Sequence, residues 1–254
     1  MKQASTATTP RRWLAAILLA SAACAASPVL AAMQLTPHSA EYKVRINVVS
    51  GQLSTNLKLT ADGYIATHAI APTGVARIFT RGSIEESSTF ISSDAGVIPV
   101  AYQSNDSLSR DKDRVDVRFD WHDNVARGTV NGKKFETTLQ GLSHDRISIQ
   151  YQLMHDLLND SPDKQYQLFD VDKMKSLNIR TLGSREVNVG AGTFTAVGIQ
   201  HQTENSSRVT TLWCVKALDY LPVIIEQHRN GKLRVQATLE SYSPLVADAP
   251  GNAE

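Results

Sequence analysis

The chain has 254 residues, of which 42% are hydrophobic and 20% are charged, and its formal net charge is +1. This composition excludes disordered and low-complexity chains, which have fewer apolar residues or a larger net charge. The near-neutral balance gives no support to a nucleic-acid partner, because proteins that bind nucleic acid are usually strongly basic.

The first 31 residues have the three parts of a secretory signal peptide. Arg11 and Arg12 precede an apolar run over residues 13–26, and the tripeptide ending at Ala31 resembles a signal-peptidase site. We therefore expect cleavage between Ala31 and Ala32, and a periplasmic location if the host is Gram-negative. The run is too short and too rich in alanine to span a bilayer well. No later apolar stretch approaches that length, so we expect no transmembrane span in the mature chain.

The two cysteines bear on export and on stability. Cys24 leaves with the signal peptide, and the alternative of a lipoprotein site there lacks the usual large aliphatic residue three positions earlier. An uncleaved anchor and a twin-arginine signal at Arg11 and Arg12 are further alternatives. Cys214 then remains alone, so packing and not a disulfide must stabilise the mature chain. Since Cys214 lies in an apolar strand pattern, we interpret it as a buried hydrophobic residue rather than a nucleophile.

From residue 40 onward the dominant pattern is an alternation of apolar and polar residues, which is typical of strands with one face in water. It is strict over residues 40–48, continues over 53–59 and returns over 114–121. Asparagine-glycine pairs favour type I′ turns, because both residues tolerate a positive φ. The expected hairpin turns are Asp62-Gly63, Asn131-Gly132, Gly190-Ala191-Gly192 and Asn230-Gly231.

One segment, residues 145–158, has the period of a helix. Its apolar stripe predicts a helix with Ser143 as N-cap, and a shorter turn is expected over residues 74–81. The strands over 212–215 and 221–225 are apolar on both faces, so we expect the stripe to cover their second face. The stripe consists of Ile147, Tyr151, Met154 and Leu158.

Hairpins with one apolar face must bury that face, either by closing into a barrel or by curling around a helix. The sequence therefore predicts a mainly β fold: a curved antiparallel sheet, or an open or closed β-barrel-like domain, with one packed α-helix. No clear linker interrupts residues 40–242. We expect a single domain over residues 32–242, followed by a disordered tail over residues 243–254.

The motifs of common enzymes and cofactor sites do not occur in the sequence. Ser143, His144 and Asp145 are the residue types of a catalytic triad, but contiguous residues cannot converge on one substrate. The seven histidines form no close pair of metal-ligand spacing. Gly190-Ala191-Gly192 precedes a strand where a dinucleotide loop requires a helix. We therefore expect no catalytic residue, no metal and no cofactor.

Three aromatic residues are candidates for a binding site. Phe119, Trp121 and Trp213 each lie in or at the end of an apolar strand pattern. One interpretation is that they line a cavity for an apolar ligand, and the other is that they pack in the core.

The second half of the chain resembles a known family. Its segments look like that family's helix motif, its glycine-centred hairpin and its closing strands, and the first half adds an aromatic residue in the first strand. On these motifs, residues 40–242 are similar to the domain-of-unknown-function 3108 family of exported bacterial proteins. The resemblance implies a mostly β, curved or barrel-like domain behind a signal peptide, and no settled activity or functional residues. The segments are Tyr42, Ile98–Tyr102, Asp145–Leu153, Glu186-Val187, Gly192–Ala196, Leu212-Trp213, Leu221–Val223 and Gly231–Leu233.

Three functions stay open from the sequence. The first is a non-enzymatic periplasmic protein that shelters an apolar or lipid-like ligand in a curved sheet. The second is an envelope-assembly or regulatory module whose open sheet docks a protein partner. The third is an enzyme of unrecognised type. A cavity would favour the first, whereas a flat, dry core with an exposed apolar patch would favour the second.

Overall fold

The structure is a computed structural model that describes residues 35–79, 81–108, 113–160, 162 and 165–245. All of these residues belong to one compact unit, Ala32–Glu254. The expected signal peptide, its cleavage site between Ala31 and Ala32, and residues 246–254 of the expected tail lie outside the described residues.

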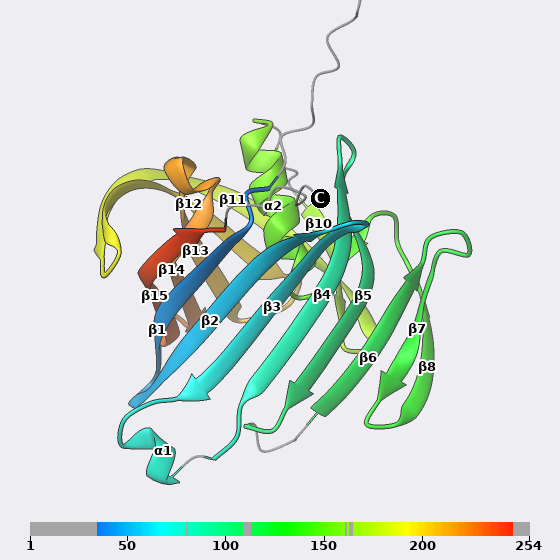
Figure 1. The fold of residues 1–254 in the computed structure, drawn as a ribbon, viewed down its shortest axis with the longest axis horizontal. Coiled ribbons are helices and arrows are strands. Elements are labelled where there is room, and N and C mark those ends of the chain that lie inside the picture. Colours follow the sequence, from blue (N-terminus) through cyan, green and yellow to red (C-terminus); the bar gives the residue numbers. More distant parts are fainter. Residues whose placement is uncertain (1–34, 80, 109–112, 161, 163–164, 246–254) are drawn as a thin grey trace, which may run out of the picture. The chain divides into compact units, whose positions relative to one another are not determined.

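The first half of the described chain forms a meander of antiparallel strands (Figure 1). Each strand pairs with the next along the chain, from β1 outward to β8. A short helix, α1 (Ala76–Phe79), follows β3 within the segment where a turn was predicted. The strands are β1 (His38–Ile46), β2 (Val49–Thr60), β3 (Gly63–Pro72), β4 (Ile84–Ser93), β5 (Gly96–Asp106), β6 (Asp113–Asp120), β7 (Val125–Val130) and β8 (Lys133–Thr138).

The second half begins with the two-residue strand β9 (Ser143–His144) and the helix α2 (Ser148–Leu158), and then returns through the same sheet. A 3-10 turn, η1 (Lys216–Leu218), lies between β13 and β14. Among the described strands, β9 and β10 are the parallel pair, and the others pair antiparallel. The strands are β10 (Gln165–Asp170), β11 (Lys173–Val189), β12 (Gly192–Thr203), β13 (Arg208–Val215), β14 (Leu221–Arg229) and β15 (Lys232–Pro244).

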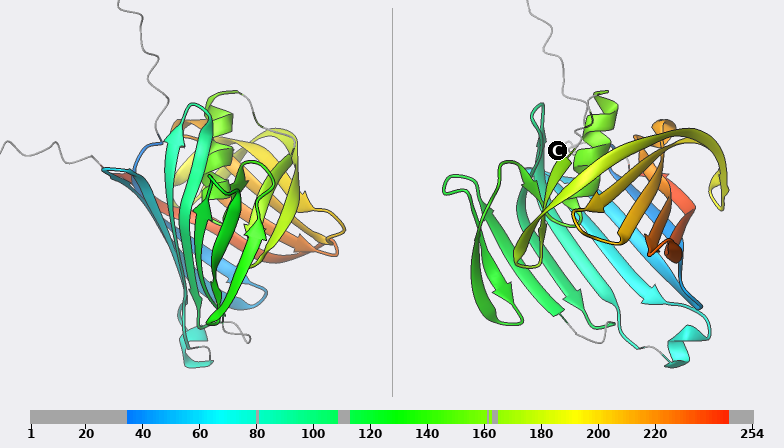
Figure 2. Two further views of the ribbon diagram at one scale, coloured as in Figure 1. Left: turned by 90° about the vertical axis from the view of Figure 1, so that its right-hand side faces the viewer. Right: turned by 180° about the vertical axis from the view of Figure 1, so that it is seen from behind.

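The two halves join through β1 and β15, which pair at the middle of the sheet. The described strands thus make one sheet of fifteen, with β8 at one edge and β9 at the other. Figure 2 shows that the sheet curls until its halves face each other, with α2 between them. The predicted mainly β fold is confirmed as an open, curved antiparallel sheet.

The alternating pattern decides which face of each strand turns inward. In β1, Ala40, Tyr42 and Val44 are buried while the residues between them are not. The asparagine-glycine pairs make the predicted tight turns, since Asn131 and Asn230 and the glycines after them all have positive φ. The expected tail begins two residues too early, because β15 runs through Pro244 and pairs there with β1.

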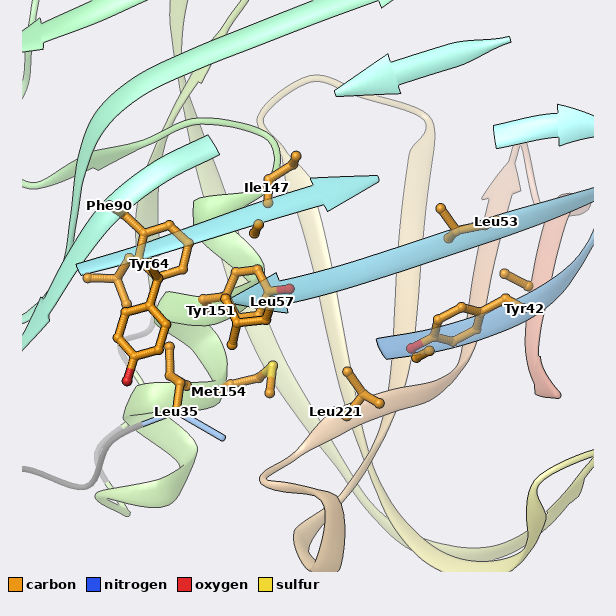
Figure 3. Close-up of a cluster of buried hydrophobic side chains, with 14 of the residues drawn as sticks. Leu35, Tyr42, Leu53, Leu57, Tyr64, Phe90, Ile147, Tyr151, Met154 and Leu221 are labelled. Atoms are coloured by element: carbon orange, nitrogen blue, oxygen red, sulfur yellow. The ribbon is translucent and has the colours of Figure 1, made fainter. Parts of the chain in front are cut away.

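The helix α2 is enclosed on two sides by apolar side chains. Its predicted stripe packs in the larger cluster, where the ring of Tyr151 lies 5.2 Å from that of Phe90 (Figure 3). Leu153 and Leu157 belong to a second cluster that contains Leu212 and Cys214. The expected packing of the stripe holds in part: the stripe shares the larger cluster with Val215 and Leu221 of the two strands, whereas the face with Cys214 is covered by another side of the helix.

The polar side of α2 is also buried, and hydrogen bonds hold it to two strands. The side chain of Gln152 accepts a bond from Val97 N in β5 at 2.7 Å and donates to Asp156 at 2.7 Å. Tyr166 in β10 donates its hydroxyl to the other oxygen of Asp156 at 2.6 Å. Buried polar groups are tolerated when they are paired, so this side needs no contact with water.

The start of α2 is capped by Asp145, so the prediction of Ser143 as N-cap is wrong. Asp145 Oδ1 accepts bonds from Ile147 N at 2.8 Å and Ser148 N at 2.9 Å, while Asp145 N donates to Ser148 Oγ. This reciprocal pair is a capping box. Ser143 lies in β9, where its hydroxyl donates to the carbonyl of Gly141 at 3.1 Å.

Cys214 is buried, as predicted, with 1% of its surface exposed, and burial raises the pKa of its thiol. Replacing it with serine should lower the free energy of unfolding by about 1–2 kcal/mol, because a hydroxyl would enter an apolar cluster. Urea unfolding of the wild type and of Cys214→Ser measures this difference. The native thiol should react with a bulky maleimide only after unfolding, and rapid labelling of the folded protein would contradict its burial.

Candidate functional site

A cavity of about 900 Å³ lies between the inner faces of the two halves of the sheet, beside the start of α2. Side chains of β2, β3 and β4 reach it from one half, and side chains of β10–β14 reach it from the other. Its size falls within the range of about 300–1,000 Å³ that is usual for small-molecule sites. The curl of the sheet therefore leaves room for a ligand that the core does not fill.

Aliphatic side chains form much of the cavity wall. They come from strands whose inward positions alternate with polar outward ones, and from the side of α2 that faces β13. Leu212 and Ile225 lie opposite each other on neighbouring strands, so they form a continuous apolar surface. The aliphatic lining residues are Leu53, Ile149, Leu153, Leu168, Leu177, Ile179, Leu212 and Ile225.

An ion-pair network lies in the wall where α2 begins. Arg146 contacts Asp170 Oδ1 at 2.6 Å and Glu86 Oε1 at 3.8 Å, and Lys175 bonds to the other oxygen of Asp170. Burial alone would raise the pKa of Asp170, but the bond from Lys175 and the charge of Arg146 outweigh it and lower the pKa. Tyr102 donates its hydroxyl to Glu86, which ties the network to β5.

Two histidines line the cavity in their neutral form. Burial lowers the pKa of His68 to about 4, with a smaller contribution from the nearby His38, and burial lowers that of His201 to about 4. His68 Nε2 is buried and has no hydrogen-bond partner among the described residues.

Two arginines lie at the mouth of the cavity. Arg208 begins β13, and Arg229, its partner in the sheet, ends β14, so both project from the last rung of these strands. Both are exposed, and neither forms an ion pair with an acid in the described ranges. A smaller cavity of about 490 Å³ adjoins this mouth and shares Arg208, Gln227 and Arg229 with it. Anionic groups are favoured near such uncompensated guanidinium groups.

None of the three aromatic residues proposed for the cavity is among its lining residues. Phe119 and Trp121 stack with ring centroids 6.0 Å apart in the larger apolar cluster, and Phe169 meets Phe119 edge-on at 5.8 Å. Trp121 also donates its ring N–H to the carbonyl of Pro99 at 2.6 Å. These contacts join β6 to β10 and leave both rings in the core.

Trp213 lies on the opposite side of β13 from Leu212. The guanidinium of Arg185 covers its ring at 3.7 Å from the centroid. The ring lies over Gly198 in β12, where an added Cβ would come within 2.9 Å of it. A glycine is therefore required at this position to admit the flat ring, which packs outside the cavity.

The contiguous Ser143, His144 and Asp145 are all buried but do not act on one point. The serine bonds to a loop carbonyl, and the aspartate bonds to the helix start and to Ser88 at 2.7 Å. Burial lowers the pKa of His144 to about 3. Within the described ranges, no group of three histidine, cysteine or acidic side chains is placed to hold a metal ion.

The lining residues were not predicted from the sequence. Leu177 and Ile179 do alternate with polar residues, but the segment around them is mostly polar and has no other strand signal. Arg208 and Arg229 flank turn regions, where charged residues are usually only solvated. These residues surround one cavity because β11–β14 pair side by side in the curled sheet. The alternation of apolar and polar residues along a single strand does not show this pairing.

The chain is similar to one protein family and to solved structures of other bacterial proteins. The family model described as "Protein of unknown function (DUF3108)" matches residues 38–238. A β-barrel-like protein of the DUF1849 family from Brucella abortus superposes with a TM-score of 0.56 at 11% identity, over 84% of this chain and 99% of that one. A putative exported protein with a YmcC-like fold from Bacteroides fragilis gives a TM-score of 0.32 at 9% identity, over 81% and 95%, which carries no argument. No curated protein matches the chain.

The first likeness supports the fold alone, since its sequence identity is low. Of the helices in the described part, none has the length and apolar character to cross a membrane.

Proposed function

This chain belongs to the DUF3108 family, and we propose that it is an exported, periplasmic protein that binds a lipid-like amphiphile without transforming it. The cavity inside the curled sheet carries this proposal, because it has the size of a ligand site and its wall combines aliphatic with polar side chains. Export rests on the leader-like sequence that ends at Ala31.

The lining favours an amphiphile over a purely apolar ligand. The aliphatic wall suits a hydrocarbon chain, whose transfer from water is favourable by about 0.8 kcal/mol per buried CH₂ group. Arg208 and Arg229 at the mouth suit an anionic head group. A ligand with an apolar chain and a negative end would satisfy both features.

The proposal is tested with cis-parinaric acid, a fatty acid whose fluorescence rises in an apolar site. The full-length mature protein should bind it saturably, and oleate should displace it. Ile179→Trp should weaken binding by about tenfold or more, because Ile179 lines the cavity and a larger ring would fill it. The matched control is Ile65→Trp, since Ile65 is exposed on β3 and should leave binding unchanged.

Thermal unfolding of both variants shows whether a loss of binding reflects a loss of folding. Saturable binding that Ile179→Trp leaves intact would place the fatty acid elsewhere and overturn the proposal. Mass spectrometry of lipids extracted from the protein purified out of a native periplasm would identify the natural ligand.

A further inference from the structure

Exposed apolar side chains gather at one end of the curled sheet. Val48, Ile78 and Val75 are 96%, 72% and 69% exposed, and no other large hydrophobic side chain of the described part is exposed as much. Val48 lies in the β1–β2 turn, while the other two lie in or beside α1 (Figure 1). Thr73 N bonds to the carbonyl of Ser50 at 3.0 Å, which holds the α1 segment against the start of β2.

Leu233 extends this surface across the next hairpin. The β1–β2 turn is bonded to β15 through Asn47 N and the carbonyl of Arg234 at 2.9 Å. Figure 2, in its right-hand view, shows α1, the β1–β2 turn and the β14–β15 turn on the same side. We call this surface the apolar rim, and its residues are Ile46, Val48, Val49, Val75, Ile78 and Leu233.

The apolar rim is surrounded by basic residues. Arg45, Lys232 and Arg234 are exposed on the same two hairpins and form no ion pair with an acid of the described residues. The sequence has no acidic residue over 42–61, 63–84 or 227–239, which are the segments that carry the rim residues. Of the described residues, four acidic ones lie near this end: Glu204 on the β12–β13 turn, and Glu85, Asp106 and Asp113 beyond α1 at the ends of β4–β6. The exposed basic residues outnumber them: Arg45, Arg77, Arg81, Arg208, Arg229, Lys232 and Arg234.

This end of the sheet is also where the cavity opens. Arg208 and Arg229 belong to the cavity mouth, and Arg234 and Asn47 of the rim hairpins line the smaller cavity that adjoins it. Asn230 N bonds to the carbonyl of Ser207 at 3.2 Å, so the turns of the mouth and of the rim are joined. A surface that meets the rim would therefore meet the mouth.

We propose that the apolar rim docks on the surface of an anionic phospholipid bilayer. Exposed aliphatic side chains ringed by Lys and Arg are typical of a face that inserts shallowly into a membrane interface. Negative lipid head groups attract such basic residues. A neutral partner would not explain why basic residues surround the apolar rim. The docking rests on the rim residues alone and stands whether or not the cavity holds a lipid.

Co-sedimentation with vesicles tests the docking. The full-length mature protein should bind vesicles of equal parts phosphatidylcholine and phosphatidylglycerol, and should bind pure phosphatidylcholine much more weakly. High salt should weaken the binding, because salt screens the attraction between the basic residues and the lipid head groups. The Debye length, beyond which exposed charges hardly interact, is about 10 Å at 0.1 M and shorter at higher salt. These measurements need no variant.

Two sets of variants separate the apolar and the basic parts. Val48→Asp with Ile78→Asp should lower the vesicle partition coefficient by about tenfold or more. Arg45→Gln, Lys232→Gln and Arg234→Gln together should lower it on the order of a hundredfold, since each basic residue contributes about fivefold. The matched controls are Leu59→Asp and Lys58→Gln at the other end of β2, which should change nothing.

Equal binding to neutral and anionic vesicles, or no binding to either, would overturn the docking. Unchanged partitioning of both rim variants would do the same. None of the substituted rim residues lines the larger cavity. Binding of cis-parinaric acid by Val48→Asp with Ile78→Asp should therefore stay at the wild-type value, which separates a failure of docking from a failure of ligand binding.

Discussion

Replacing Met154 with alanine should lower the free energy of unfolding by about 2–5 kcal/mol, because it leaves a cavity in a packed core. Met154 is 2% exposed and lies among the apolar residues that surround Tyr151 (Figure 3). The helix α2 is buried on both its apolar and its polar sides, so the surrounding structure can collapse only partly around the lost side chain. Urea denaturation monitored by circular dichroism measures the change.

Met174 provides the matched control for this substitution. It is a half-buried methionine at the edge of the same cluster, on β11, so Met174→Ala should cost distinctly less. The result also distinguishes a core helix from a movable lid. A loss near zero for Met154→Ala, together with a change in retention of cis-parinaric acid, would mean that α2 opens over the cavity.

Replacing Asp145 with alanine should destabilise the protein by about 3 kcal/mol or more, since it leaves several buried donors without an acceptor. Its carboxylate accepts bonds from two backbone N–H groups of α2 and from the hydroxyl of Ser88 in β4. All of these groups are inaccessible to water, so water cannot replace the lost acceptor. Calorimetry or urea unfolding of Asp145→Ala gives the size of the loss.

The isosteric variant Asp145→Asn separates the cap from the charge. Its amide oxygen can still accept the two N–H bonds, and the hydroxyl of Ser88 can turn to accept a bond from the amide. We expect Asp145→Asn to lose about 1 kcal/mol. Asp94→Ala, in the exposed β4–β5 turn, should have almost no effect. An equally small loss for Asp145→Ala would show that the cap does not stabilise α2.

The strands and turns could largely be predicted from the sequence, because these depend on local patterns. Alternation around Tyr42 and Val117 marks which side of a strand is buried, and Asn131-Gly132 can adopt the positive φ values of a tight hairpin wherever it lies. The helix α2 was recognised from its apolar stripe for the same reason. Its N-cap was not, because Ser143 and Asp145 both have capping side chains and only the backbone path decides between them.

The candidate site could not be predicted in the same way. The large aromatic residues Phe119, Trp121 and Trp213 are the strongest apolar signals, but their size lets them fill the core or cover the outer face. The cavity wall instead uses smaller aliphatic residues such as Ile179 and Leu212. Nothing local distinguishes an aliphatic side chain that faces a cavity from one that faces another side chain.

The sequence by itself determined the strand class, the inward face of the clearly alternating strands, most hairpin turns and the position of the main helix, because each depends on neighbours a few residues apart. Only the tertiary structure decided that β1 and β15, almost two hundred residues apart, pair at the centre of one open sheet. That pairing and the curl of the sheet place α2 between the two halves, enclose the cavity beside it and bring the rim hairpins to its mouth. These are long-range outcomes of burying every apolar face at once, and no local pattern contains them.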